Sequence, residues 1–85
     1  MYKVKLSRQA RKYYESADAG TARRLNEVFV LLKGNAFPPG AERLKGELAG
    51  SSKIRVGQLR IIYDVIESVL RIDVIKIGPR GDVYK

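Results

Sequence analysis

The sequence lacks cysteine and histidine. Without cysteine the chain has no disulfide framework, no thiolate nucleophile and no zinc site of the usual kind. Without histidine it also lacks the side chain that most often moves protons or binds metals near neutral pH. Any catalytic group must therefore be Lys, Arg, Tyr, Asp, Glu or Ser, and we expect neither a cofactor nor a metal.

Long apolar runs are missing as well. No stretch approaches the ~18 residues that a membrane span requires, and the N-terminal MYKVKLSRQA lacks the continuous apolar segment of a signal peptide. We therefore expect a soluble cytoplasmic protein that makes no membrane contact. The 85 residues suffice for one domain, which we place at 1–85.

Acidic residues are scarce relative to basic ones. Nine Asp and Glu stand against 17 Lys and Arg, which gives a net charge of +8. Such an excess favours a polyanionic partner such as RNA, DNA or an acidic protein segment. Charge alone is equally compatible with a well-solvated basic surface.

The first 34 residues predict a strand followed by two helices. The alternation of YKVKL indicates a half-buried strand, and Ser7 after it is a candidate helix N-cap. Apolar positions recur at helical spacing over residues 8–17, and a second helical stripe runs on to Gly34. The DAG between them is typical of a turn, so the second helix is capped by Asp18 or Thr21.

The segment KIRVGQLR predicts a tight hairpin. Gly57 occupies the first central position of a two-residue loop, where a type II′ turn needs positive φ. Val56 then faces Leu59, and Arg55 faces Arg60. Because like charges directly opposite one another destabilise a sheet, this arrangement points to a purpose other than stability.

A second tight turn is predicted at Glu67 and Ser68, between two β-rich runs. The resulting register forms an apolar ladder on one face and one charge pair on the other. It pairs Ile66 with Val69, Val65 with Leu70, Tyr63 with Ile72, Ile61 with Val74, and Asp64 with Arg71. It also places Ile75 and Ile77 on the face opposite the apolar ladder.

These elements predict an α+β fold with the order β-α-α-β-β-β. A four-stranded, mainly antiparallel sheet carries a two-helix hairpin packed on one face. The first strand joins the sheet beside the last strand, in parallel, because the helical hairpin connects it to the rest. The second face of the sheet stays partly open.

Cations gather on that open face in the predicted register. Lys53, Arg55 and Arg60 lie on it, and Arg80 and Tyr84 follow just beyond the last strand. Arginine forks bind phosphate oxygens in pairs, and a bound anion offsets the repulsion among the cations. Taken singly, each residue is commonly a solvated strand cation or a packing tyrosine. Their convergence favours a phosphate site.

Two segments resemble the RelE/ParE superfamily of toxin–antitoxin toxins, specifically its RelE-like ribonuclease branch. RLKGELAGSSKIRVGQLRIIYDV is similar to the family's L-K/R-G segment and its I-R-V-G-x-x-R-I-I-Y core, and IGPRGDVYK to its I-G-x-R-x-x-V-Y ending. The resemblance covers nearly the whole chain. It implies the toxin of a type II module, a ribosome-dependent mRNA endoribonuclease that uses basic residues and a tyrosine instead of a metal.

The resemblance implies catalytic roles for the same five residues. RNA cleavage through the 2′-hydroxyl needs a base, charge stabilisation at phosphorus and a proton for the leaving 5′-oxygen. Lys53 is the candidate base, because crowding by arginines disfavours its charged form. Arg55 and Arg60 suit charge stabilisation, Arg80 suits the leaving group, and Tyr84 suits stacking on a base or orienting the 2′-hydroxyl.

Partners also follow from the resemblance: a cognate RelB-like antitoxin, mRNA and the ribosome, with operator DNA contacted only through the antitoxin complex. Two alternatives stay open. A ParE-like protein inhibits DNA gyrase without ribonuclease chemistry, although the presence of Lys53, Arg60, Arg80 and Tyr84 together argues against this. A catalytically weak toxin acts mainly as an antitoxin-binding module.

Overall fold

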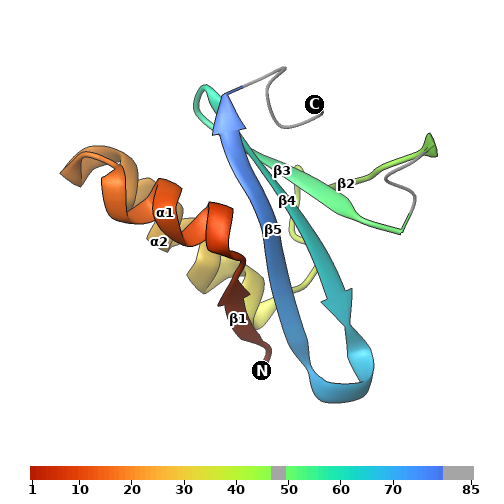
Figure 1. Cartoon of the computed structure of the whole chain (residues 1–85). Coiled ribbons are helices and arrows are strands. Elements are labelled where there is room, and N and C mark those ends of the chain that lie inside the picture. The colour runs from red at the N-terminus through yellow and green to blue at the C-terminus, as the bar shows by residue number, and fades with distance from the viewer. Residues whose placement is uncertain (47–49, 80–85) are drawn as a thin grey trace.

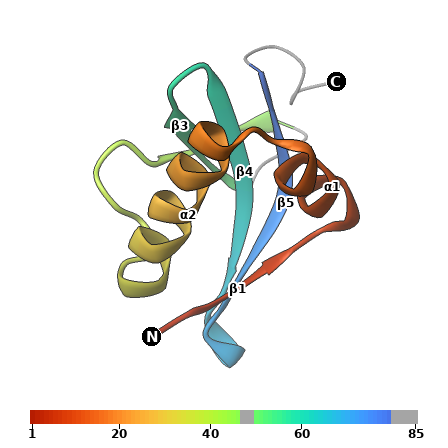
Figure 2. The ribbon, with the colours of Figure 1, turned by 90° about the vertical axis from the view of Figure 1, so that its left-hand side faces the viewer.

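The computed structural model describes residues 1–46 and 50–79. Two helices lie on the same side of one sheet (Figures 1 and 2). The elements, in chain order, are β1 (Lys3–Leu6), α1 (Arg8–Ser16), α2 (Ala19–Gly34), β2 (Glu42–Arg43), β3 (Ser52–Val56), β4 (Leu59–Ile66), the 3₁₀ turn η2 (Glu67–Val69) and β5 (Arg71–Pro79).

Both helices begin at side-chain caps. The Ser7 hydroxyl accepts a hydrogen bond from the Ala10 amide at 3.1 Å, and the Asp18 carboxylate accepts one from the Thr21 amide at 3.0 Å. The bond to Thr21 lowers the pKa of Asp18 from its usual value. Of the two caps that the sequence predicts for α2, Asp18 is therefore the correct one.

The sheet has five strands in the order β1-β5-β4-β3-β2. β1 runs parallel to β5 and the other neighbours are antiparallel, so the predicted α+β class and the parallel position of the first strand are confirmed. The predicted count of four strands is wrong, because the two-residue β2 pairs with β3. So short and charged a segment carries no periodicity from which a strand can be predicted.

The predicted register of the second hairpin is also wrong. The turn occupies Glu67–Leu70, with Leu70 in the left-handed region at φ 50°, so Ile66 pairs with Arg71 and Tyr63 with Val74. A turn two residues longer shifts the pairing by two and keeps each side chain on its predicted face. Asp64 consequently faces Asp73 instead of Arg71.

A β-bulge next changes which face the end of β5 presents. The register shifts between Ile62 and Tyr63, which leaves Ile75 without an opposite residue and pairs Ile61 with Ile77. Ile77 is therefore fully buried in the core and Ile75 is 39% exposed. The predicted position of Ile77 on the open face is wrong, because the extra residue reverses the alternation.

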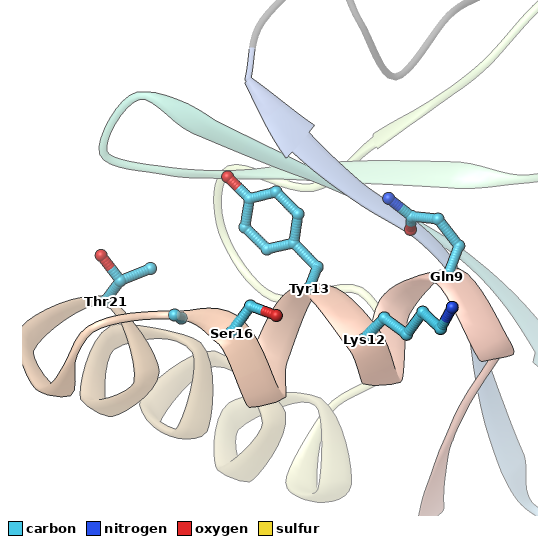
Figure 3. A pocket seen from close by; sticks show the side chains of 6 residues that line it. Gln9, Lys12, Tyr13, Ser16 and Thr21 are labelled. Atoms are coloured by element: carbon cyan, nitrogen blue, oxygen red, sulfur yellow. The ribbon is translucent and has the colours of Figure 1, made fainter.

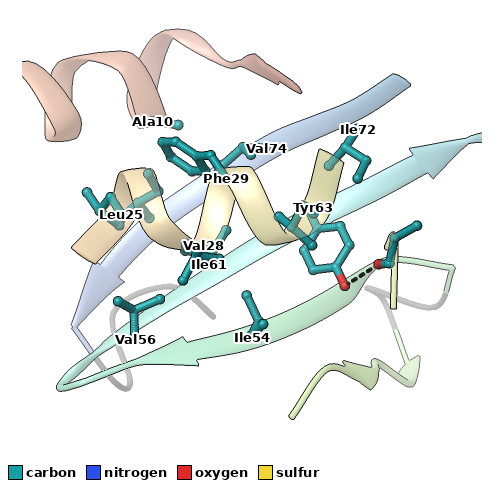
Figure 4. Packing of buried hydrophobic residues seen from close by; sticks show 13 residues of the cluster. Ala10, Leu25, Val28, Phe29, Ile54, Val56, Ile61, Tyr63, Ile72 and Val74 are labelled. Atoms are coloured by element: carbon teal, nitrogen blue, oxygen red, sulfur yellow. Dashed lines mark hydrogen bonds between the residues drawn. The ribbon is translucent and has the colours of Figure 1, made fainter. Parts of the chain in front are cut away.

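The core lies between the helices and one face of the sheet (Figure 4). Leu25, Phe29 and Leu32 of α2 pack on the apolar residues of β3, β4 and β5. Tyr63 is fully buried there, and its hydroxyl donates a 2.8 Å hydrogen bond to the carbonyl of Ala36. Burial raises the pKa of Tyr63.

Beyond the end of β1, the side chains of Ser7 and Gln9 hydrogen-bond to the backbone of β5 along its outer edge. Ser7 Oγ donates to the Ile75 carbonyl at 2.6 Å. The side-chain amide of Gln9 donates through Nε2 to the Ile77 carbonyl at 2.7 Å, and its Oε1 accepts from the Ile77 N–H at 2.9 Å. These bonds occupy backbone groups that an exposed strand edge offers to other chains. Within the described ranges, no helix has the length and apolar character needed to cross a membrane.

Candidate functional site

The β3–β4 turn brings two arginines together at one end of the sheet. Gly57 has φ 60°, as the predicted type II′ turn requires, and Val56 pairs with Leu59. Arg55 is therefore directly opposite Arg60. The register predicted for this hairpin is confirmed, and so is the juxtaposition of like charges.

The two rows of side chains nearest the Gly57 turn on the open face of the sheet form what we call the cation face. One row consists of Lys53, Ile62 and Lys76, and the other of Arg55, Arg60 and Gly78. Lys53, Arg55 and Arg60 thus share a face, as the sequence predicts. Lys76 is a fourth cation that the sequence analysis missed, because only the bulge turns it to this side. Gly78 adds no side chain beside Arg60.

Arg60 is unusual among these cations because it is buried. Only 7% of its surface is exposed, and its Nε has no hydrogen-bond partner in the part of the chain that the structure describes. Buried donors are normally satisfied, and an unsatisfied one costs about 1–3 kcal/mol. An acceptor placed at Nε would remove this cost.

Two hollows adjoin Arg60. One, of about 300 Å³, is lined by Gly40, Glu42, Lys53, Arg55 and Arg60. The other, of about 110 Å³, is lined by Arg55, Gly57, Gln58, Leu59 and Arg60. Arg55 and Arg60 line both, so an anion in either hollow meets two guanidinium groups with fixed donor geometry.

The larger hollow also contains a carboxylate that the sequence analysis missed. β2 pairs Glu42 with Lys53, and Glu42 Oε2 lies 3.5 Å from Lys53 Nζ. The Glu42 side chain is 68% exposed and that of Lys53 is 23% exposed. Lys53 therefore has an anionic neighbour as well as the arginines that the sequence predicts around it.

Two of the five predicted site residues, Arg80 and Tyr84, lie outside the described residues. The last described residue, Pro79, pairs with Leu59 next to the Gly57 turn. The described part of the site thus comprises Lys53, Arg55 and Arg60, with Lys76 and Glu42 as additions. This arrangement is suited to holding a phosphate, with a lysine beside it to exchange a proton.

Comparisons with known proteins place this geometry in context. No protein family and no curated protein matches the sequence. Among solved structures, a chain of the archaeal RelE–RelB complex from Pyrococcus horikoshii OT3 has 29% identity and a TM-score of 0.81, covering 94% of this chain and 96% of the other.

Two further solved chains show the same likeness. The YoeB/ParE toxin from Agrobacterium tumefaciens has 27% identity and a TM-score of 0.82, over 92% of this chain and 98% of its own. The isolated RelE toxin of E. coli has 22% identity and a TM-score of 0.79, over 99% and 92%. The likeness therefore spans nearly the whole length of each chain.

Proposed function

The chain belongs to the RelE/ParE toxin superfamily, and we propose that it is the toxin of a type II toxin–antitoxin module that cleaves mRNA on the ribosome. The observation that carries this proposal is the buried guanidinium of Arg60, whose Nε is unpaired among the described residues and which lines a 300 Å³ hollow opposite Arg55. A phosphodiester supplies a negative charge for this pair and an acceptor for the Arg60 Nε.

In the proposed reaction the RNA supplies its own nucleophile. The 2′-oxygen attacks the adjacent phosphorus, the bond to the 5′-oxygen breaks, and a 2′,3′-cyclic phosphate and a 5′-hydroxyl result. A base takes the 2′-hydroxyl proton, and an acid gives one to the 5′-oxygen. The step requires neither a water nucleophile nor a metal, and we propose that it proceeds without one.

Each cation has a separate role in this proposal. Arg55 and Arg60 hold the non-bridging oxygens, where negative charge grows in the transition state. Lys53, which also lines the 300 Å³ hollow, accepts the 2′-hydroxyl proton. Arg80 protonates or clamps the leaving 5′-oxygen, and Tyr84 stacks on a base beside it.

The proposed partners match the charge of the cation face. A cognate RelB-like antitoxin neutralises the toxin by covering this face with an acidic or amphipathic segment. Similar solved chains from Pyrococcus horikoshii and E. coli come from RelE–RelB and RelBE complexes, which supports such a partner. Operator DNA is contacted through the antitoxin complex only.

The test is a ribosome-programmed cleavage assay with purified toxin. We expect cleavage of the mRNA within the A-site codon, and we expect it to be lost in a Lys53→Ala, Arg60→Ala, Arg80→Ala variant that keeps its circular dichroism spectrum. A gyrase supercoiling assay is run in parallel. Inhibition of gyrase without mRNA cleavage would replace this proposal with a ParE-like function.

A further inference from the structure

A cleft on the helical side of the molecule lies apart from the cation face. It has a volume of about 450 Å³, within the range of small-ligand sites, and is lined by Gln9, Lys12, Tyr13, Ser16, Ala17 and Thr21. In Figure 3 the ring of Tyr13 rises from α1 between the side chains of Gln9 and Thr21. We call this the helix cleft.

The helix cleft combines an aromatic ring with a cation and neutral polar groups. Tyr13 is half-buried, and one part of it packs on the core. Lys12 and Ser16 are exposed. No carboxylate is among the lining residues. An aromatic platform beside a positive charge is the combination with which proteins hold the bases of single-stranded nucleic acid.

Two connections place the helix cleft at the same end of the sheet as the Gly57 turn. Gln9 is hydrogen-bonded to Ile77, and two residues further along β5, about 7 Å, Pro79 pairs with Leu59 beside the turn. From the other side, Thr21 lines the cleft and Arg24 follows it by three residues on α2, about 4.5 Å along the helix.

Arg24 bridges the space between α2 and the turn. Its Nη1 lies 3.5 Å from the point that a Cβ on Gly57 would occupy. Gly57 is also the residue that joins the strand of Arg55 to the strand of Arg60. Arg24 also helps to lower the pKa of Asp18. The exposed guanidinium therefore lies between the cation face and the helix cleft.

We propose that the helix cleft binds the base of a nucleotide that flanks the cleaved phosphodiester, with Arg24 neutralising a backbone phosphate that crosses the turn. This inference rests on the proposed RNA cleavage. The RNA strand runs from Arg55 and Arg60 over the Gly57 turn, past Arg24, to the ring of Tyr13. Recognition of a flanking base then adds affinity without adding a group to the reaction.

The experiment compares two single-stranded RNAs by fluorescence anisotropy with the full-length toxin. One is a dinucleotide and the other extends on both sides of the same step, and each has a 2′-deoxy sugar at the step to prevent cleavage. We expect Tyr13→Leu, which keeps apolar packing, to weaken binding of the long RNA about five- to 100-fold and to leave the dinucleotide unchanged. Tyr13→Phe keeps the stacking face and retains wild-type affinity.

Arg24 has a matched control in its neighbour Arg23, which is exposed on the same helix. Arg24→Ala should reduce the slope of log affinity against log salt by about 0.7 for the long RNA, as expected for one lost phosphate contact. Arg23→Ala should leave that slope unchanged.

The outcomes separate this inference from the proposed function. If Tyr13→Leu and Tyr13→Phe bind the long RNA equally, or if the long RNA binds no tighter than the dinucleotide, the helix cleft has no such role, although ribosome-programmed cleavage still stands. If the wild-type protein cleaves no mRNA, the proposed function fails and this inference fails with it.

Discussion

Arg60 is a residue whose position is unfavourable for the folded chain alone. It is 7% exposed, its Nε is unpaired among the described residues, and it faces a second arginine. Replacement of a buried, poorly paired charge by an apolar side chain of similar size is often neutral or stabilising. We expect Arg60→Met to raise the free energy of unfolding by about 1–2 kcal/mol in anion-free buffer, measured by urea denaturation.

Arg55→Met is the matched control for Arg60. Arg55 is exposed and faces the same partner, so its replacement removes the repulsion without removing a buried donor. We expect its effect to stay within about 0.5 kcal/mol. Inorganic phosphate should stabilise the wild-type protein and not Arg60→Met, because only the former binds the anion. A destabilised Arg60→Met protein, or equal stabilisation of both by phosphate, would refute this account.

Tyr63 is the opposite case, a buried polar group that is satisfied. Its hydroxyl donates to the Ala36 carbonyl at 2.8 Å and so ties the loop after α2 to the sheet. Tyr63→Phe should lower the free energy of unfolding by about 1–2 kcal/mol, since the carbonyl loses its partner in the core. Thermal or urea unfolding at pH 7 measures this loss.

The pH dependence of the same pair tests the burial of Tyr63. Burial raises its pKa above the ordinary 10.0. The folded chain therefore holds this proton more tightly than the unfolded chain, and the stabilisation is fully present below pH 10 and decreases as the pH rises further. As the pH rises above 10, the wild-type protein should lose stability more steeply than Tyr63→Phe. Parallel curves would show that burial does not raise the pKa of Tyr63 in the folded chain.

At the scale of elements, turns and helix caps could be predicted from the sequence because residues within a few positions determine them. Gly57 has the positive φ that its turn needs, and Ser7 and Asp18 cap the helices that follow them. The Arg55–Arg60 pairing follows directly from the length of that turn. Three members of the candidate site were therefore placed on the correct face by residues within a few positions of them.

The turn between β4 and β5 depends instead on residues far away in the sequence. The Lys3 amide donates to the Leu70 carbonyl at 2.9 Å, and the Tyr2 hydroxyl donates to Glu67 at 2.8 Å. These contacts from β1 and the residue before it accompany a left-handed Leu70, for which the local sequence gives no signal. At the bulge, the Ile75 carbonyl likewise accepts a hydrogen bond from the hydroxyl of Ser7, 68 residues away in the sequence. Such long-range contacts explain why the position of Lys76 was missed.

β2 contributes one interaction that matters for the site. It places Glu42 3.5 Å from Lys53, where it competes with an incoming phosphate for the lysine. Exposed pairs of this kind are worth about 0.2–1 kcal/mol. Glu42→Gln should therefore bind non-cleavable RNA up to about fivefold more tightly, measured by fluorescence anisotropy.

Glu27→Gln is the control for that substitution. Glu27 is exposed on α2, and its replacement changes the net charge by the same amount. If both variants gain affinity equally, the effect is one of overall charge and Glu42 has no specific role. If only Glu42→Gln gains, the short strand limits access to Lys53.

At the scale of the whole molecule, both helices lie on one face of the sheet (Figure 2), and Lys53, Arg55 and Arg60 lie on the other. The apolar alternation of β3 and β4 that packs Ile54 and Ile61 on the helices turns Lys53 and Arg60 to the opposite side. One pattern thus sets both the core and the cation face. The net charge of +8 is the sum of this face and the rest of the surface, so the total charge does not locate the proposed RNA-binding surface.

Two double variants with the same change in net charge locate the binding surface. Arg55→Gln with Lys76→Gln removes two cations from the cation face near the Gly57 turn. Lys3→Gln with Lys5→Gln removes two exposed cations from the edge strand β1, where they pair with Arg71 and Asp73 at the end of the sheet away from the Gly57 turn. For single-stranded RNA, each lost phosphate contact reduces the salt slope by about 0.7. We expect the first pair to reduce it by about 1.4 and the second to leave it nearly unchanged. Equal reductions would mean that RNA responds to the overall field of the protein, and the site at Arg55 and Arg60 would then lose its main support.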